Sequence, residues 1–507
     1  MSDLASPFVK LDRHTRALAD HLAPAADLNS ASSVLTWDQQ TYMPEGGIPH
    51  RAEALATLSR ISHDIVASDE TARLLEEVGD PEPGSDAAAV VRLARRSHDR
   101  ATKLPARLVA EASRAAALAE PAWRRARLES DFGSLVPHLK KIVDLQREKA
   151  ERIGYEDHPY DALLDLYEPG AKKTALETMF DDLKRGTADL VGRISSPDED
   201  RAAPLRGRFD EVKQEVFGRT VATAFGYDWS RGRQDRAPHP FCINFGGPGD
   251  VRITTRFDPH WLSPALFATL HETGHALYEQ GVDPDYSRTP LAGGASLGIH
   301  ESQSRLWENL VGRSRPFWEH YYPRLRELFP DALNGTDPEA FYRAINAARP
   351  SEIRVEADEL TYNLHVVLRF ELEVALIEGS LKVEDLPAAW NAGMQDHLGI
   401  VPHDDAHGVL QDDHWAIGFF GYFPTYTLGN VISAQLFDAA VNARPEIPSR
   451  MAQGQFDPLL TWLRENVHRP GKKHDPSDLV ERATGKPPET APYLRYLSEK
   501  FGELYEF

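Results

Sequence analysis

The chain has 507 residues, with 57 Lys and Arg against 78 Asp and Glu, so its formal net charge is −21. An acidic surface of this size repels a phosphate backbone, and we therefore expect no nucleic-acid partner. The single cysteine, Cys242, excludes an internal disulfide, a Cys-based structural zinc site and an iron–sulfur cluster. With 41% hydrophobic and 27% charged residues, the composition is typical of a globular protein.

Nothing in the sequence predicts a membrane partner. The N-terminus has no apolar run after a basic start, so we expect no signal peptide and a cytoplasmic location. The segment 415–437 carries no charge and is long enough to span a bilayer, but it contains Gly418, Gly421 and Pro424. These breakers favour a buried interior segment instead.

Over most of the chain, the spacing of apolar residues and the composition predict α-helices. The expected helical stretches are His50–Val78, Ala87–Leu118, a stretch beginning at Pro121 and continuing to Ile153, and Thr174–Ile194. Ser195–Pro204 is expected to be a surface loop.

The periodicity changes once, where Val251, Ile253 and Thr255 alternate with polar residues after a glycine-rich turn. We therefore expect a small β-sheet within a mainly α-helical protein. No linker separates independent domains, so residues 1–507 are interpreted as one helical domain. An organisation of that domain as two lobes around a groove stays open.

The residues that carry chemistry begin with L-H-E-T-G-H-A-L, because His271 and His275 are four residues apart. On a helix this spacing places both imidazoles on one face, where both can reach one zinc ion. Glu272 is then placed to take a proton from water. Ser263 is expected to cap this helix. The alternative is a pair of ordinary histidines on a surface or core helix.

The third ligand must come from elsewhere, because Tyr278 and Gly281 replace the Gly and His of a metzincin. Glu301, 26 residues after His275, is the favoured ligand, and Glu308 is the competing candidate. A helix N-terminal carboxylate that interacts with the helix dipole is the alternative interpretation of Glu301.

Together with other motifs, this pattern resembles the carboxypeptidase Taq family of zinc metallocarboxypeptidases. The resemblance covers nearly the whole chain, and its motifs are T-W-D-Q-Q-T-Y-M-P (36–44), H-P-F (239–241), G-D-V-R-I-T-T-R (249–256), H-E-T-G-H (271–275), H-E-S-Q (300–303), I-R-V-E-A-D (353–358), G-V-L-Q-D-D-H-W (408–415) and G-Y-F-P-T-Y-T-L-G-N (421–430). Cys242 departs from the pattern, since Thr is expected there, but it is not expected to touch the metal site.

The resemblance implies a saddle-like helical fold with a deep central groove and a short sheet beside the zinc site. It also implies removal of single residues from peptide C-termini, broad side-chain tolerance with Pro disfavoured, and a homodimer. Carried over position by position, it gives His271, His275 and Glu301 as zinc ligands and Glu272 as general base. Cobalt is a possible substitute for zinc.

A carboxypeptidase must recognise a free carboxylate, and the planar guanidinium of Arg suits this task. Arg354 is the candidate, with an ion pair to Asp358 on the same helix face as the alternative. Arg252 and Arg256 are the other possible anchors.

Hydrolysis also needs hydrogen-bond donors for the developing oxyanion. His414 and Tyr426 are the catalytic candidates, Tyr422 lies beside them, and aromatic core packing is the alternative. Asp412 or Asp413 is available to orient His414. His239 is expected to line the substrate site. The alternative interpretation is that His239 has only a structural role.

Two rival functions share these motifs. A zinc endo- or oligopeptidase would use the same His₂Glu site but would not need a free C-terminus. A non-enzymatic binding protein with a structural zinc would lack Glu272 or add a fourth protein ligand, and neither feature is found.

Overall fold

The computed structural model describes residues 11–194 and 201–507. It is 67% helical with one small three-stranded sheet, which confirms the expected mainly α-helical fold. The chain divides into two compact units, and neither is continuous in sequence. Unit 1 comprises Met1–Thr102, Ala202–Ile345 and Gln435–Pro487, and unit 2 comprises Lys103–Arg201, Asn346–Ala434 and Pro488–Phe507.

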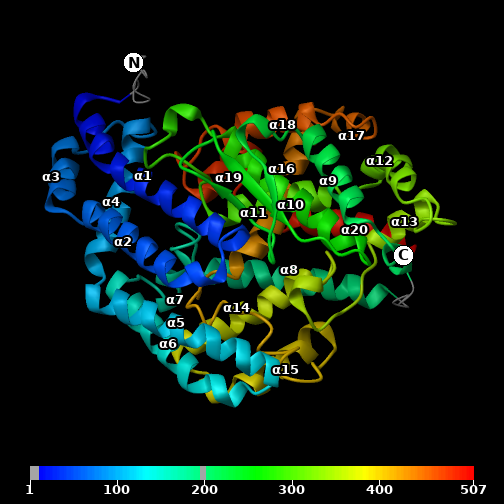
Figure 1. Cartoon of the computed structure of the whole chain (residues 1–507), viewed down its shortest axis with the longest axis horizontal. Helices are drawn as coiled ribbons and strands as arrows, with labels where there is room; N and C mark the ends of the chain where they lie inside the picture. The colour runs from blue at the N-terminus through cyan, green and yellow to red at the C-terminus, as the bar shows by residue number, and fades with distance from the viewer. Residues whose placement is uncertain (1–10, 195–200) are drawn as a thin grey trace. The chain divides into compact units, whose positions relative to one another are not determined.

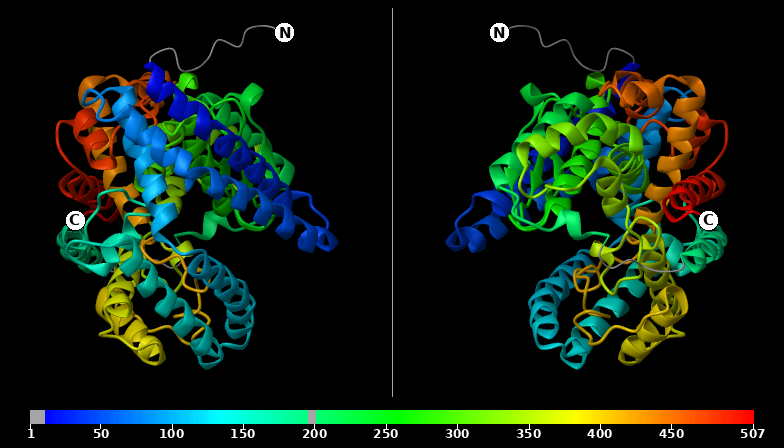
Figure 2. Two further views of the ribbon diagram at one scale, coloured as in Figure 1. Left: turned by 90° about the vertical axis from the view of Figure 1, so that its left-hand side faces the viewer. Right: turned by 90° about the vertical axis from the view of Figure 1, so that its right-hand side faces the viewer.

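Unit 1 begins with a helical group built around α1. Its α-helices are α1 (Arg13–Thr41), α2 (Ile48–Val66), α3 (Asp69–Val78) and α4 (Asp86–Lys103, whose last residue belongs to unit 2). Helices α1 and α2 pack along each other, as the dark-blue pair in Figure 2 shows. Leu18, Leu74, Val90 and Leu291 form the buried apolar cluster that joins α1, α3 and α4.

The rest of unit 1 surrounds α10 (Leu262–Gly281). The other helices are α9 (Glu211–Phe225), α11 (Leu297–Arg305), α12 (Arg315–Leu328), α13 (Pro338–Ile345), α17 (Ile447–Met451), α18 (Asp457–Leu463), α19 (Pro476–Thr484) and the C-terminal part of α16 (Pro424–Ala443). Two π-helical segments, η5 (Leu306–Val311) and η8 (Arg464–His468), follow α11 and α18. The short 3₁₀ turns are η1 (Glu45–Gly47), η2 (Ala203–Leu205), η3 (Trp229–Arg231) and η4 (Pro284–Tyr286).

The sheet has the strand order β1-β3-β2, with bounds Gln234–Arg236, Val251–Thr255 and Cys242–Asn244 respectively. β1 runs parallel to β3 and β2 runs antiparallel to it, with Ile253 opposite both Gln234 and Cys242. The turn before β3 needs a glycine at Gly246, whose φ is +84°. β2 and β3 pack on α10, beside the green helices of Figure 1. The sheet therefore supports the helix that carries His271 and His275.

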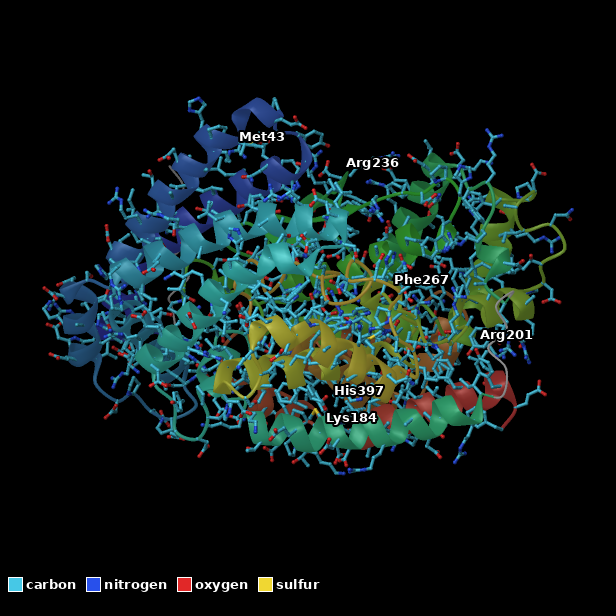
Figure 3. The ribbon with its side chains drawn as sticks, turned by 90° about the horizontal axis from the view of Figure 1, so that it is seen from below. Met43, Lys184, Arg201, Arg236, Phe267 and His397 are labelled. Carbon is cyan, nitrogen blue, oxygen red and sulfur yellow. The ribbon has the colours of Figure 1, made fainter. Side chains whose placement is uncertain are left out.

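The described part of unit 2 contains helices and irregular segments but no strand. Its α-helices are α5 (Ala106–Glu129), α6 (Phe132–Ile153), α7 (Pro159–Leu164), α8 (Lys173–Arg193), α14 (Tyr362–Glu378), α15 (Leu386–Leu398), α20 (Ala491–Tyr505) and the N-terminal part of α16, with 3₁₀ turns η6 (Arg354–Glu356) and η7 (Val383–Asp385). α14 is the central helix, packing against α6, α7, α8 and α15. Figure 3 shows Lys184 of α8 next to His397 of α15, because both side chains bind Glu371 of α14, at 2.7 and 2.8 Å.

Several predicted element boundaries were wrong. The stretch 50–78 is two helices, because Ser68 caps α3 by accepting from the Thr71 amide. Pro121 lies inside α5 rather than at a helix start, since a proline removes one backbone hydrogen bond without having to end a helix. Ser263 is not the cap of α10, because Trp261 occupies that position without a side-chain cap.

Two other predictions concern the loop 195–204 and the uncharged segment 415–437. Part of the expected loop 195–204 lies outside the described residues. The uncharged segment 415–437 contributes to α16, and its residues Phe420, Phe423, Val431 and Ile432 are buried, as expected. Within the described chain, every helix is too short or too polar to cross a membrane.

Candidate metal centre

The structure brings His271, His275 and Glu301 together in unit 1. One ligand atom from each lies within 4.8 Å of the other two. The Nε2 atoms of His271 and His275 lie 3.8 and 3.5 Å from Oε2 of Glu301. Both histidines come from α10 and the glutamate comes from α11, so the packing of these two helices forms the cluster.

A glycine makes this packing possible. A Cβ added at Gly274 would lie 2.6 Å from the backbone oxygen of Gln303 and 2.7 Å from Cα of Ser304. Only a residue without a side chain lets α10 and α11 approach this closely. The glycine of the H-E-T-G-H motif thus sets how far the two imidazoles lie from Glu301.

Second carboxylates orient both histidine rings. Nδ1 of His271 donates to Oε2 of Glu308 at 2.9 Å, which leaves the Nε2 lone pair free to face Glu301. Glu308 therefore contacts the far side of the ring and is not among the three facing groups. The π-helical segment η5 carries it there, and Arg305 and Arg313 bind it at 3.2 and 3.4 Å.

His275 is oriented through a second histidine. Nε2 of His300 lies 2.7 Å from Oε1 of Glu279, and an ionised carboxylate can only accept, so this nitrogen carries the proton. Nδ1 of His300 lies 2.6 Å from Nδ1 of His275, and in the tautomer of His300 that carries its proton on Nε2 alone, Nδ1 accepts from Nδ1–H of His275. The Nε2 lone pair of His275, on the side of the ring that faces Glu301, is thereby available to a metal ion. Such chains of hydrogen bonds are common behind metal-binding histidines.

The sequence reasoning missed His300 and Glu279. A signal for Glu279 was present, because it follows His275 by four residues on the same helix face. His300 adjoins Glu301, but its hydrogen bond to His275 depends on how α10 and α11 pack.

Burial and neighbouring charges separate the carboxylates of this cluster. Burial raises the pKa of Glu272 to about 7, and Glu301 and Glu308 add to this effect. Burial also opposes ionisation of Glu301, but His271 and Arg305 outweigh it and hold its pKa below the usual range. For Glu308, Arg305 and the hydrogen bond from His271 overcome burial and lower the pKa to about 2. Two carboxylates are thus held ionised, while Glu272 titrates near neutrality in the metal-free cluster.

The imidazoles also respond to burial. Burial lowers the pKa of His275 to about 4, so this ring is neutral at pH 7. Burial acts the same way on His271, but Glu301 and the hydrogen bond to Glu308 outweigh it and raise its pKa. Two imidazoles and an ionised carboxylate form a donor set that fits a divalent ion of the zinc type.

The Cys242 thiol responds to the charge of carboxylates near this cluster. Burial raises the pKa of its thiol well above the usual value, with further contributions from Glu272 and Glu279. β2 packs on α10 and carries Cys242 toward these carboxylates. These effects act through charge and are not contacts, so the expectation that Cys242 does not touch the metal site stays a prediction.

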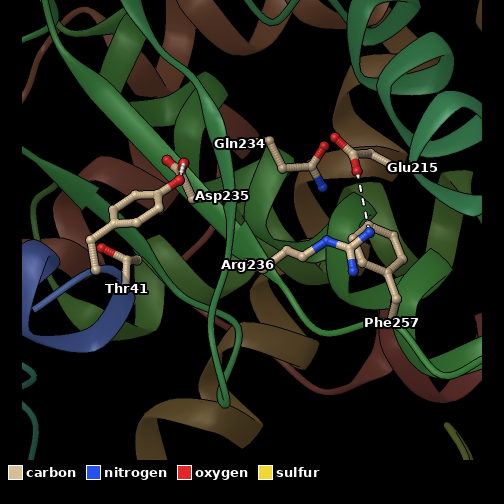
Figure 4. A pocket seen from close by; sticks show the side chains of 7 residues that line it. Thr41, Glu215, Gln234, Asp235, Arg236 and Phe257 are labelled. Atoms are coloured by element: carbon tan, nitrogen blue, oxygen red, sulfur yellow. Dashed lines mark hydrogen bonds and ion pairs between the residues drawn. The ribbon is translucent and has the colours of Figure 1, made fainter. Parts of the chain in front are cut away.

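The other predicted anchors of unit 1 have different surroundings. Arg252 binds both oxygens of Asp250, at 2.9 and 2.7 Å, and its guanidinium lies over the rings of Trp37 and Phe245. Arg256 and His239 are exposed. A pocket of about 340 Å³ beside β1, drawn in Figure 4, is lined by other residues, including Tyr42, Asp235 and Arg236.

Arg354, His414, Tyr422 and Tyr426 belong to unit 2. Arg354 is 5% exposed and donates from Nε and Nη2 to Oδ1 of Asp412, at 3.1 and 2.8 Å. It also donates from Nη1 to the Tyr362 hydroxyl at 2.9 Å. The alternative pair with Asp358 was wrong, because the 3₁₀ turn η6 ends at Glu356 and never places the two residues on one helix face. Three of the five guanidinium N–H groups are used in these bonds.

His414 and Tyr426 are neighbours. Nε2 of His414 lies 3.3 Å from the Tyr426 hydroxyl, and Nδ1 lies 3.3 Å from Oδ1 of Asp413. Asp412 binds Arg354 and also Arg369, whose Nε donates to Oδ2 at 2.6 Å. Of the two candidates to orient His414, Asp413 is therefore the one in contact with an imidazole nitrogen.

Comparison with known proteins shows a family and individual relatives to which this chain is similar. The family model of carboxypeptidase Taq (M32) metallopeptidases matches residues 17–501. Thermostable carboxypeptidase 1 of Thermus thermophilus is 45% identical over 95% of this chain and 96% of its own length. Carboxypeptidase 1 of Bacillus subtilis is 38% identical over 98% of this chain and 100% of its own.

Solved structures of carboxypeptidases are also similar to this chain over nearly its whole length. The M32 carboxypeptidase from Deinococcus radiodurans R1 superposes with a TM-score of 0.93 at 41% identity, covering 98% of this chain and 100% of the other. Metallocarboxypeptidase 1 of Trypanosoma cruzi gives a TM-score of 0.91 at 32% identity, covering 96% and 99%.

Proposed function

This chain belongs to the carboxypeptidase Taq (M32) metallopeptidase family and is a metallocarboxypeptidase, a peptide hydrolase, and from this premise we propose how its own residues carry out the reaction. Its substrates are peptides, and its cofactor is a divalent metal ion. We propose that the ion is zinc, that His271, His275 and Glu301 hold it, and that Glu272 is the general base.

The spacing of the three ligand atoms supports this assignment. Ligands about 2.1 Å from a tetrahedral zinc ion lie about 3.4 Å from one another. Oε2 of Glu301 lies 3.5 and 3.8 Å from the two imidazole Nε2 atoms, so small side-chain shifts suffice. Cobalt accepts the same imidazole and carboxylate ligands, and we propose that it can replace zinc at this site.

A bound ion would lower the pKa of a water molecule and polarise the scissile carbonyl. Glu272 follows the first ligand on α10 and is 6% exposed. We propose that its carboxylate accepts the proton of the attacking water and then delivers it to the leaving amine. Glu308, His300 and Glu279 keep the two imidazoles in the tautomers that present Nε2.

Arg354 is the first of the proposed substrate contacts. Arg354 has guanidinium donors beyond those used by Asp412 and Tyr362, and we propose that they bind the free C-terminal carboxylate. His414 and Tyr426 are proposed to donate to the oxyanion, with Tyr422 beside them and His239 of unit 1 also contacting substrate. Asp412 keeps the Arg354 side chain in one orientation.

The experiment is a digestion of one peptide with a free C-terminus and of its amidated form, followed over time by mass spectrometry. We expect stepwise loss of single C-terminal residues from the free peptide, none from the amide, and no cleavage with a chelator. Internal cleavage of both peptides would favour the endo- or oligopeptidase alternative. Arg354→Lys should raise KM for the free peptide, whereas Arg256→Lys, at an exposed position, should not.

The remaining properties are proposed on the family resemblance. They are broad tolerance of C-terminal side chains with Pro disfavoured, a homodimer and a cytoplasmic location. Peptides ending in Ala and in Pro test the first property through their kcat/KM values, and sedimentation equilibrium tests the second.

A further inference from the structure

A second group of metal-ligating side chains lies in unit 2 and takes no part in the proposed reaction. Glu352, His403 and His407 each offer one ligand atom, and these atoms lie within 4.8 Å of one another. Nδ1 of His403 lies 2.7 Å from Oε2 of Glu352. The two imidazole rings are 4.0 Å apart between centroids. Two imidazoles and a carboxylate thus converge outside the site described above.

Asp404 orients the two rings. Nδ1 of His407 lies 2.8 Å from Oδ1 of Asp404 and must donate, because a carboxylate only accepts. This bond leaves the lone pair on Nε2 of His407. Oδ2 of the same carboxylate lies 3.5 Å from Nε2 of His403. By the same rule Nδ1 of His403 donates to Glu352, so an ion must take the place of that proton. Nε2–H of His403 then faces Asp404, which can accept from the outer nitrogen of each ring, as carboxylates do behind metal-binding histidines.

The buried side-chain amide of Gln411 links the backbone segments that carry this cluster. Gln411 is 8% exposed, and its Nε2 donates to the backbone oxygens of Glu352 and His407 at 3.0 and 2.9 Å. Its Oε1 accepts from the backbone N–H of Arg354 at 2.8 Å. The segments that carry the three ligands are therefore held next to each other before any ion binds, which reduces the entropy lost on binding.

We propose that Glu352, His403 and His407 form a second binding site, for a divalent transition-metal ion such as Zn²⁺, Co²⁺ or Ni²⁺. Imidazole ligands favour these ions over Mg²⁺ and Ca²⁺, which prefer oxygen. The side chains of His403 and His407 are 60% and 44% exposed, so an ion reaches them from solvent and keeps water on its open positions.

An ion bound at this second site should stabilise the folded chain. The ion would link residue 352 to the loop of residues 403–407, and both ends continue into segments with proposed substrate contacts, Arg354 and His414. Because an ion that binds only the folded state stabilises it, the melting temperature should rise with ion concentration.

The test counts zinc ions bound to the full chain in equilibrium dialysis against Zn²⁺. We expect two ions per chain in the wild type, one in His403→Ala/His407→Ala and one in His271→Ala/His275→Ala. Equal counts in the wild type and in His403→Ala/His407→Ala would overturn the proposal. The difference between these two proteins does not depend on the proposed catalytic site, so failure of either assignment is recognised separately.

A second measurement adds Ni²⁺ or Mg²⁺ to protein that carries a single zinc ion per chain. Ni²⁺ should raise the melting temperature of the wild type and of His260→Ala, a control at an exposed histidine of unit 1, but not that of His403→Ala/His407→Ala. Glu352→Gln should reduce the shift. An equal shift with Mg²⁺, or an unchanged Ni²⁺ shift in His403→Ala/His407→Ala, would contradict ligation by these imidazoles.

Discussion

At the scale of single residues, three glutamates beside the same two imidazoles differ in pKa because their partners differ. Glu301 and Glu308 contact Arg305, which favours their ionised forms. Glu272 is buried among carboxylates, so its pKa is raised to about 7. These surroundings suit Glu301 to hold a cation and Glu272 to exchange a proton.

Glu272→Gln should therefore keep its metal ion and lose turnover. A general base contributes about 10²–10⁴-fold to the rate, so we expect kcat to fall at least about 100-fold. Zinc content measured on the same sample should equal that of the wild type. Glu327→Gln, an exposed change on α12, should keep full activity. Normal turnover in Glu272→Gln would refute the proposed base.

Glu308→Gln separates a ligand from a residue that orients one. The amide oxygen can still accept from Nδ1 of His271, but without charge, so zinc affinity should fall about 10–100-fold. Turnover at saturating zinc should be largely retained. Glu301→Gln should bind zinc far more weakly than Glu308→Gln. The reverse order, measured by competition with a chelator, would make Glu308 the ligand.

At the scale of elements, the metal cluster depends on the contact between α10 and α11. The motif spacing places His271 and His275 on one face of α10, but the distance to Glu301 depends on how closely the two backbones approach. Gly274 permits that approach. Gly294 is a second position where a side chain would not fit, because an added Cβ would lie 2.7 Å from the ring of Tyr278 and 2.8 Å from the ring of His300.

Gly274→Ala should weaken zinc binding and stability together. Its Cβ would meet the Gln303 oxygen at 2.6 Å, so α11 must shift, at a cost of about 1–3 kcal/mol. We expect a lower midpoint in urea unfolding and a higher zinc dissociation constant. Gly249→Ala has no atom within 4 Å of the added Cβ and is the matched control. Unchanged zinc affinity in Gly274→Ala would contradict this account.

Glu373 of α14 anchors the segment that carries His414 and Tyr422. Its carboxylate accepts from the Tyr160 hydroxyl at 2.6 Å, from Trp415 Nε1 at 2.9 Å and from the Gly421 amide at 2.9 Å. Both oxygens are used, and both are buried with the side chain.

Glu373→Gln should therefore destabilise the protein, because an amide nitrogen would face a donor in place of one oxygen. We expect a loss of about 1–3 kcal/mol in the free energy of unfolding. Glu371→Gln is the control on the same helix, since its carboxylate is 40% exposed and its partners Lys184 and His397 stay accessible to water. Equal losses in the two variants would show that Glu373 has no special role.

At the scale of the whole molecule, the chain passes between the two units at five points. Helix α16 begins in unit 2 and ends in unit 1, with the boundary after Ala434. A helix shared by two units transmits unfolding of one to the other, because helix formation is cooperative. A single domain stays our prediction, and cooperative unfolding tests it.

We therefore expect one calorimetric unfolding transition whose van't Hoff enthalpy matches the calorimetric enthalpy. Metal-free protein should be compared with the zinc-loaded form, which should melt at a higher temperature in the same single step. Two separated transitions would show that the units unfold independently.

Much of the fold and of the site could be predicted from the sequence. Helical spacing and composition predicted the helical character of α2 to α6 and of α8, alternation predicted β3, and H-E-T-G-H predicted two imidazoles on one face of α10. Helix boundaries were less accurate, because a cap such as Ser68 and an internal proline such as Pro121 have the same local composition whether a helix continues or ends.

The sequence by itself determined the chemistry that is available. It supplied imidazoles and carboxylates without thiol pairs, at spacings set by helix geometry, and motifs that indicate the family. Only the tertiary structure decided which distant groups meet: Glu308 behind His271, His300 behind His275, Asp412 rather than Asp358 on Arg354, and Glu352 beside His403. Such contacts join residues up to 58 positions apart, as between Arg354 and Asp412. They follow from backbone packing at positions such as Gly274, which periodicity along one element does not encode.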